Sequence, residues 1–187
     1  MSGITTFASS GQALTAALLA SSIDPADAIR LLSSMLTYSP VSTTPSGAVG
    51  TSMTTMQGGI NDLMRRSAIA ALARASALYQ PTSFDDAVNV RTQLCALFDA
   101  EILIAGNQGA DATYTALRAL RASVVSDLTT RGAVLATLTT ISSNLPMPSA
   151  VLAQRYYRDS TRADELVVEA NPIHPAFMPI KFKALSQ

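Results

Sequence analysis

The chain has 187 residues, of which 48% are hydrophobic and only 14% are charged, and 13 acidic residues balance 13 basic ones. This length allows one or two domains with buried cores. The charge balance argues against nucleic-acid binding driven by bulk charge, which needs a clustered excess of Lys and Arg. A weakly charged chain also has little self-repulsion, so its composition suits an assembly subunit whose surfaces are covered by neighbours.

Other features of the composition narrow the class of protein further. Cys95 is the only cysteine and falls on the apolar stripe of a predicted helix, where a free cysteine behaves as a small hydrophobe. No apolar run approaches the ~20 residues of a membrane span. The segment Met1–Thr5 lacks the basic region of a signal peptide. We therefore expect a protein that is made in the cytoplasm and stays there or in a particle assembled there.

The first two predicted helices form a helical hairpin. Residues 10–22 are rich in Ala and Leu, and the second helix is expected to start at Asp24, which can cap it, with Pro25 in its first turn. The predicted inward positions of the first helix are Leu14, Ala17, Leu18 and Ile23. Those of the second are Ala28, Ile29, Leu32, Met35 and Leu36. Each set has the spacing of one helix face.

Residues 39–52 contain Pro, Gly, Ser and Thr without periodicity, which predicts a loop or linker. The pair Gly58 and Gly59 is expected to delay the third helix until Ile60. Apolar residues then recur at helical spacing as far as Leu78, and Pro81 ends the helix.

Two more helices follow. Residues 83–86 are a variant of the capping box, with Asp86 in place of the usual Glu, and the helix that they open ends at 106–109. Asp111 starts the next helix and Gly132 ends it. The inward positions are Phe84, Ala87, Val88, Leu94, Cys95, Phe98 and Ile102 in the first of these helices, and Tyr114, Leu117, Leu120, Val124 and Leu128 in the second.

The periodicity changes after Gly132. Residues 135–141 are rich in β-branched side chains and are predicted to form a strand. After a rigid turn, Ser149 is expected to cap a short helix that ends at Tyr157, and Ser160 or Thr161 a second one that ends at Glu169. A final strand is predicted with Ile180, Phe182 and Ala184 on its buried side and Lys181 and Lys183 on the other.

This strand–helix–helix–strand order resembles a LysM-like βααβ unit. The expected fold class is therefore mainly α, a helical hairpin plus long helices, with a small C-terminal α+β unit of the LysM-like type. The expected domains are a helical body at 1–132, with its loop at 39–52, and the LysM-like unit at 133–187.

Several segments together resemble the C-terminal half of the Mu-like bacteriophage N protein family, whose historical name is DNA circularisation protein. These segments are 23–28, 83–87, 99–101, 117–128, 152–157, 162–166 and 171–177. The last three, Leu-Ala-Gln-Arg-Tyr-Tyr, Arg-Ala-Asp-Glu-Leu and Asn-Pro-Ile-His-Pro-Ala-Phe, are the most specific. Family members usually carry a large region ahead of this part, whereas here Met1 lies just ahead of it, so the roles of that region are not carried over.

The resemblance implies a structural component of a contractile phage tail, at the baseplate hub or the start of the tail tube. It implies oligomers around the tail axis that pack against other baseplate, hub and tail-tube proteins. The expected location is the virion, assembled in the host cytoplasm.

The residues suggest no catalytic, cofactor or metal site, and we expect no enzyme activity and no small-molecule substrate. His174 is the only histidine and is expected to be a loop residue that packs or hydrogen-bonds. The acidic pairs at 85–86 and 164–165 fall in the first turns of predicted helices, where capping and the helix dipole explain them.

The candidate interface residues are Arg155, Tyr156, Tyr157 and Arg158. At least one tyrosine ring is expected to fill the small core of the C-terminal unit, and the other is available to a partner. The arginines, together with Arg162, are expected to pair with Asp159, Asp164, Glu165 or a neighbour's carboxylates.

Three functions remain open at this point. The first is the tail subunit. The second is a glycan-binding LysM-like module, although the Gly-Asp-Thr common in such binders is replaced here by residues 144–149, Asn-Leu-Pro-Met-Pro-Ser. The third is DNA binding or circularisation, which the neutral charge makes the weakest of the three.

Overall fold

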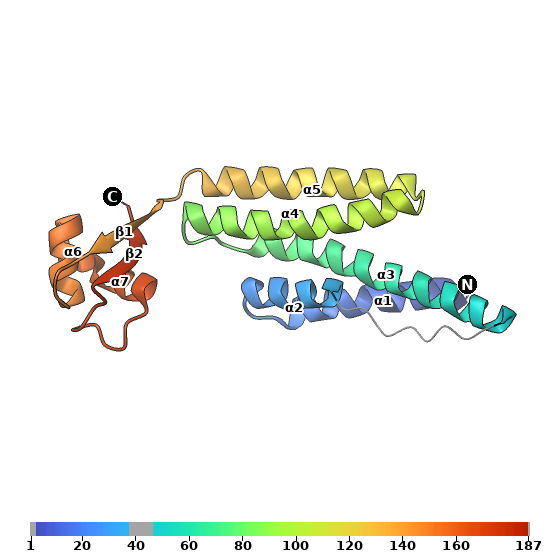
Figure 1. Ribbon diagram of the computed structural model, residues 1–187, viewed down its shortest axis with the longest axis horizontal. Coiled ribbons are helices and arrows are strands. Elements are labelled where there is room, and N and C mark those ends of the chain that lie inside the picture. Colours follow the sequence, from blue (N-terminus) through green and yellow to red (C-terminus); the bar gives the residue numbers. More distant parts are fainter. Residues whose placement is uncertain (1–2, 38–46, 187) are drawn as a thin grey trace. The chain divides into compact units, whose positions relative to one another are not determined.

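The computed structural model describes residues 3–37 and 47–186 and is mainly helical, with a small two-stranded antiparallel sheet, as predicted (Figure 1). In chain order the elements are α1 (Gly3–Ser21), α2 (Pro25–Thr37), α3 (Ala48–Leu78), α4 (Phe84–Asn107), α5 (Asp111–Gly132), β1 (Leu138–Ser142), α6 (Ser149–Tyr157), the 3₁₀-helix η1 (Ser160–Arg162), α7 (Ala163–Ala170) and β2 (Lys181–Leu185). No helix within these described ranges has the length and apolar character to cross a membrane.

The chain divides into two compact units. The first comprises Met1–Gln80 and Val90–Thr129, and the second comprises Pro81–Asn89 and Thr130–Gln187. The start of α4 therefore belongs to the second unit. Each unit has its own cluster of buried apolar side chains.

In the first unit, the hairpin of α1 and α2 packs on α3, and the buried face of α2 is the predicted one. The Asp24 carboxylate accepts a hydrogen bond from the Ala26 N–H at 2.9 Å, which confirms the predicted cap. The inward face of α1 was predicted wrongly, because Leu14 is 48% exposed, Ile23 is fully exposed and Ala17 is exposed as well. With no charged residue in α1, apolar periodicity alone did not distinguish the faces of this helix.

Helix α3 is longer than predicted. It begins at Ala48, so residues 48–52 are helical and not part of a loop, while residues 39–46 of that predicted loop lie outside the described ranges. Gly58 and Gly59 do not delay the helix, which runs through both. Hydroxyl groups of its first turns donate to the carbonyl four residues back, as Thr51 does to Gly47 and Ser52 to Ala48. The hydroxyls are thus compatible with a helical backbone. The long helical segment after Ile60 also lets the helix extend through the two glycines, because adding residues to an existing helix costs less than starting one.

The limits of α4 and α5 agree with the sequence. The Ser83 hydroxyl accepts the Asp86 N–H at 3.1 Å, but Asp86 accepts the N–H of Thr82 and not that of Ser83, so only half of the capping box forms. Gly109 adopts a φ of 67° in the turn between the helices. At the other end of α5, Gly132 lies so close to Ala87 that an added Cβ would sit 2.8 Å from the alanine Cβ.

In the second unit, β1 and β2 pair antiparallel, with Leu138 opposite Leu185 and Ser142 opposite Lys181. Phe182 and Ala184 are buried and the two lysines are exposed, as predicted. The first strand starts at Leu138, three residues later than predicted. Ile180 precedes β2 and is 54% exposed, so its predicted burial is wrong.

Both predicted caps of the short helices are also wrong. Ser149 is the first residue of α6, and Pro148 occupies the capping position without a side-chain bond. Ser160 and Thr161 lie inside η1, which Asp159 caps by accepting the Thr161 N–H at 2.9 Å. A carboxylate two residues ahead of a free N–H is a favourable acceptor for this bond.

Candidate functional site

The two tyrosines at the end of α6 hold the sheet of the second unit. Tyr156 donates its hydroxyl hydrogen to the Ser142 carbonyl at the end of β1, and Tyr157 to the Leu185 carbonyl at the end of β2, both at 2.7 Å. Both rings are half-buried against the core of this unit. The sequence predicted that at least one ring packs into the small core of this unit, and in the structure both rings pack against it.

Arg162 covers the ring of Tyr157. Its guanidinium carbon lies 3.8 Å from the ring centroid, and its Nε and Nη2 both donate to the Glu165 carboxylate, at 2.9 and 2.6 Å. The pairing of Arg162 with Glu165 was among the predicted ones. Burial first, and then the negative charge of Glu165, raise the pKa of the Tyr157 hydroxyl. This arrangement leaves little of the Tyr157 ring free to stack on a ligand.

Arg155 and Arg158 are the exposed members of the candidate interface. Arg158 ends α6 in the left-handed conformation, with φ 57°. The guanidinium group of neither arginine has a hydrogen bond or ion pair with another residue of the described ranges. Their guanidinium groups are therefore accessible, in contrast to the two tyrosine hydroxyls between them.

The remaining candidate residues have structural partners. His174 accepts the Ala176 N–H on its Nδ1 at 3.0 Å, which confirms it as a loop residue that hydrogen-bonds. Asp85 accepts the Leu138 N–H at 2.7 Å and so ties the first turn of α4 to β1, a contact that the sequence did not reveal. Within the described residues, no three His, Cys, Asp or Glu side chains are grouped so as to hold a metal ion.

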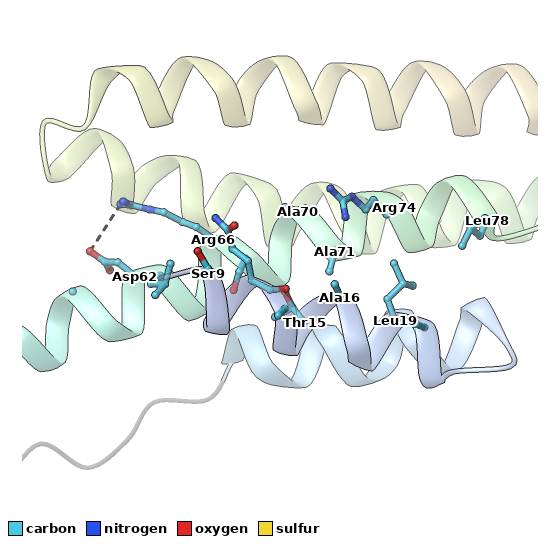
Figure 2. Close-up of a pocket in the computed structure, with 16 residues that line it drawn as sticks. Ser9, Thr15, Ala16, Leu19, Asp62, Arg66, Ala70, Ala71, Arg74 and Leu78 are labelled. Carbon is cyan, nitrogen blue, oxygen red and sulfur yellow. Dashed lines mark hydrogen bonds and ion pairs between the residues drawn. The ribbon is translucent and has the colours of Figure 1, made fainter. Parts of the chain in front are cut away.

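A groove that the sequence did not predict runs between α1 and α3 (Figure 2). This α1–α3 groove has a volume of about 1050 Å³ and is lined mostly by small residues, among them Ala13, Ala16, Ala70 and Ala71. Three charged side chains, Asp62, Arg66 and Arg74, contribute to its wall. Arg74 is exposed and has no ion pair or hydrogen bond with a described residue.

A buried carboxylate lies behind this wall. Glu101 of α4 is 2% exposed and accepts Arg65 Nε at 2.8 Å and Arg66 Nε at 3.2 Å. Asp62 pairs with Arg65 and accepts the Gln108 amide at 2.8 Å. Glu101 continues the buried series of Leu94, Phe98 and Ala105 along one face of α4, so a charged residue on an apolar face was the sequence signal for this cluster.

The N-terminal part of α3 carries an exposed apolar row. Val49, Met53, Met56 and Ile60 are 75%, 59%, 66% and 38% exposed and follow one another at steps of four, three and four residues. This spacing places them on one side of the helix. We call these four residues the α3 stripe.

Comparison of the chain with protein-family models finds no match, and comparison with curated protein sequences finds none either.

Proposed function

We propose that this protein is a structural subunit of a contractile phage tail, at the baseplate hub or the start of the tail tube. It acts by assembly with copies of itself and with other baseplate, hub and tube proteins. The observation that carries the proposal is the exposed apolar α3 stripe, together with the α1–α3 groove, which is lined mostly by small residues. Contiguous exposed apolar surface of this kind marks interaction sites.

The sequence resemblance to the Mu-like N protein family supplies the setting for this assembly role. The segments that carry the resemblance most specifically all lie in the second unit, which has the order β1–α6–η1–α7–β2. We propose that this unit is a LysM-like βααβ unit used for structure. In support, its two tyrosines are engaged by strand carbonyls at both ends of the sheet.

Tail particles test this proposal directly. The phage whose genome encodes the chain is purified, its tails are separated from heads, and both fractions are examined by quantitative mass spectrometry. We expect the chain in the tail fraction at a fixed ratio to the tube protein. Its absence from intact virions, or a monomer that persists when all tail proteins are mixed with it, contradicts the proposal.

The second candidate, a glycan-binding module, is tested by retention on insoluble peptidoglycan. Specific retention that is lost in Tyr156→Ala or Tyr157→Ala favours it only if the variant keeps its fold, because each hydroxyl also holds a strand. Phenylalanine at the same positions keeps the ring and removes only the hydroxyl. Retention by the Phe variants and loss in the Ala variants would favour ring stacking on a sugar.

A further inference from the structure

We propose that the α3 stripe of one copy packs into the α1–α3 groove of a second copy, so that copies associate head to tail. The inference rests on the proposed assembly role and names the partner for the surface that carries it. It concerns the isolated chain and does not require the phage-tail setting, so the two proposals can fail separately.

The charge pattern favours a second copy as the occupant of the groove. Residues 1–23 and 31–61 contain no charged residue, and these stretches include all of α1 and the whole α3 stripe. The α1 side of the groove has no charged residue, and most of the residues that line the groove are small. An uncharged apolar helix suits that side, because a charged side chain would lose its hydration there without a partner. The chain itself carries such a helix.

The dimensions of the two surfaces also agree. The α3 side of the groove extends from Gly59 to Leu78, which is about 30 Å of helix at 1.5 Å per residue. The uncharged start of α3, residues 48–61, is about 21 Å long and fits within that length. Small groove residues such as Ala16 and Ala70 allow a third helix to approach closely, and the larger Val and Met side chains of the stripe fill the space between.

Within one copy the stripe remains open. Gly11 of α1 lies against Leu63 and Met64 of α3, and the two helices run in the same direction (Figure 1). The first turns of α3 therefore reach beyond the start of α1, and α1 does not cover Val49 or Met53. Against the described residues, the side chains of Met53 and Met56 remain 59% and 66% exposed, so a second molecule can give them an apolar environment.

A stripe and a groove are different surfaces, so their contact is heterologous. One copy offers its groove to the next copy, and its own stripe to the previous one. Such contacts close into a ring or continue as a filament, depending on the rotation between neighbours. A ring is the form that a position around a tail axis requires.

Two charged variants test the inference by complementation. Met53→Lys/Met56→Lys disables the stripe, and Ala16→Arg/Ala70→Arg disables the groove. All four side chains are exposed, so the monomer fold tolerates the changes, and circular dichroism checks this. The single variants Met56→Lys and Ala16→Arg replace any double variant that fails the check. Both pairs are positive, so a disabled stripe does not bind a disabled groove.

We expect wild-type protein to form oligomers in sedimentation velocity experiments, and each variant alone to be monomeric. An equimolar mixture of the two variants then forms a dimer and nothing larger, because it contains one intact stripe facing one intact groove. The matched control is Leu103→Lys/Val168→Lys, which adds the same charge outside the stripe and the groove, at residues that are 65% and 75% exposed. We expect this control to associate like wild type.

Three results would overturn the inference. A wild-type chain that stays monomeric at all accessible concentrations excludes self-association. A groove variant that still associates shows that the stripe pairs with another surface, such as a second stripe. A mixture that stays monomeric excludes the head-to-tail contact. None of these results bears on whether the chain occurs in tails, which the analysis of virions decides.

Discussion

The cluster around Glu101 shows how a buried charge is made tolerable in this fold. A carboxylate that is 2% exposed would carry a large desolvation cost if it were alone. Two guanidinium groups from consecutive residues of α3 satisfy it, and both remain partly open to water, at 21% and 28% side-chain exposure. The cluster thus fixes the pairing of α3 with α4 at one point along their length.

We expect Glu101→Gln to destabilise the first unit by about 2–3 kcal/mol. Breaking a buried ion pair costs about 3–5 kcal/mol, and the partial hydration of Arg65 and Arg66 reduces this value. Urea unfolding monitored by circular dichroism measures the change. Asp27→Asn is the matched control, because it removes an exposed pair with Arg30 and should cost less than about 0.5 kcal/mol. Equal losses in the two variants would contradict the structural role of the cluster.

Glu169 on α7 is a carboxylate in an unfavourable place. Partial burial first, and then the negative charges of Glu165 and Asp86, raise its pKa in the folded protein. The folded state therefore holds this proton more tightly than the unfolded state does. The contribution of Glu169 to stability is full at acid pH, below its unfolded pKa, and is lost as the pH rises through its folded pKa.

We therefore expect Glu169→Gln to stabilise the second unit at pH 7 by about 0.5 kcal/mol, the size of a like-charge helix pair. The gain should disappear below about pH 4, where the carboxyl is protonated in both states. Thermal unfolding of both proteins across this pH range gives the comparison. Glu165→Gln is the control of opposite sign, because it removes one of the two oxygens that accept from Arg162 and the negative charge that pairs with it. A gain for Glu169→Gln that is the same at pH 4 and pH 7 would rule out the electrostatic cause.

At the scale of the element, the glycines of the helices differ in whether the surrounding structure leaves room for a side chain. Gly58 is exposed within α3, and a Cβ built on it meets no atom within 4 Å. Gly132 is buried at the end of α5, where a Cβ would come within 2.8 Å of the Ala87 Cβ. The first glycine only weakens its helix, and the second permits a close approach.

We expect Gly58→Ala to stabilise the protein by about 1 kcal/mol through helix propensity alone. Gly132→Ala should instead destabilise it, since Ala87 or the backbone must shift to relieve the contact. Denaturant midpoints of the two variants, measured side by side, give the result. A destabilising Gly58→Ala would indicate that α3 is not a regular helix at this point.

The elements that the sequence predicted best have both a cap and a periodic face. Helix α2 has Asp24 at its start and apolar residues at helical spacing, and α4 and α5 have similar signals, so their limits were predicted to within a few residues. The start of α3 has neither, because its Gly, Ser and Thr residues are those of a loop. Its helical form depends on the longer helix to which it is joined and on hydroxyls bonded back to carbonyls.

The candidate surfaces were harder to predict than the helices. Tyr156 and Tyr157 stand out as an aromatic pair, but only the fold shows that both hydroxyls are used by strand carbonyls. The α1–α3 groove was missed because its residues come from two helices about fifty positions apart. Exposed Ala16 and Ala70 look the same in sequence as buried Ala68 and Ala75. Periodicity identifies an apolar face but not whether it is covered.

On the scale of the whole molecule, the charges are distributed unevenly. Only Asp24, Asp27 and Arg30 are charged among the first 61 residues, and the other charged residues all lie in 62–187. Helix α1 and the α3 stripe have no charged residue and α2 has only Asp27 and Arg30, whereas the helices and strands after them carry the charges that keep their outer surface hydrated. This asymmetry predicts which forces hold the copies together.

If copies associate through the α3 stripe and the α1–α3 groove, salt should not separate them. Raising NaCl from 0.1 M to 1 M shortens the Debye length from about 10 Å to about 3 Å and weakens ion pairs between exposed charges. An interface of apolar and small side chains has no such pairs to lose, and sulfate should strengthen it. Sedimentation velocity over this range should therefore show an unchanged oligomer fraction in NaCl and a larger one in ammonium sulfate.

The variant Ala16→Arg/Ala70→Arg should stay monomeric in both salts, which separates specific association from precipitation. Dissociation of the wild-type oligomer in 1 M NaCl would instead show that ion pairs, and not the apolar stripe, hold the copies together.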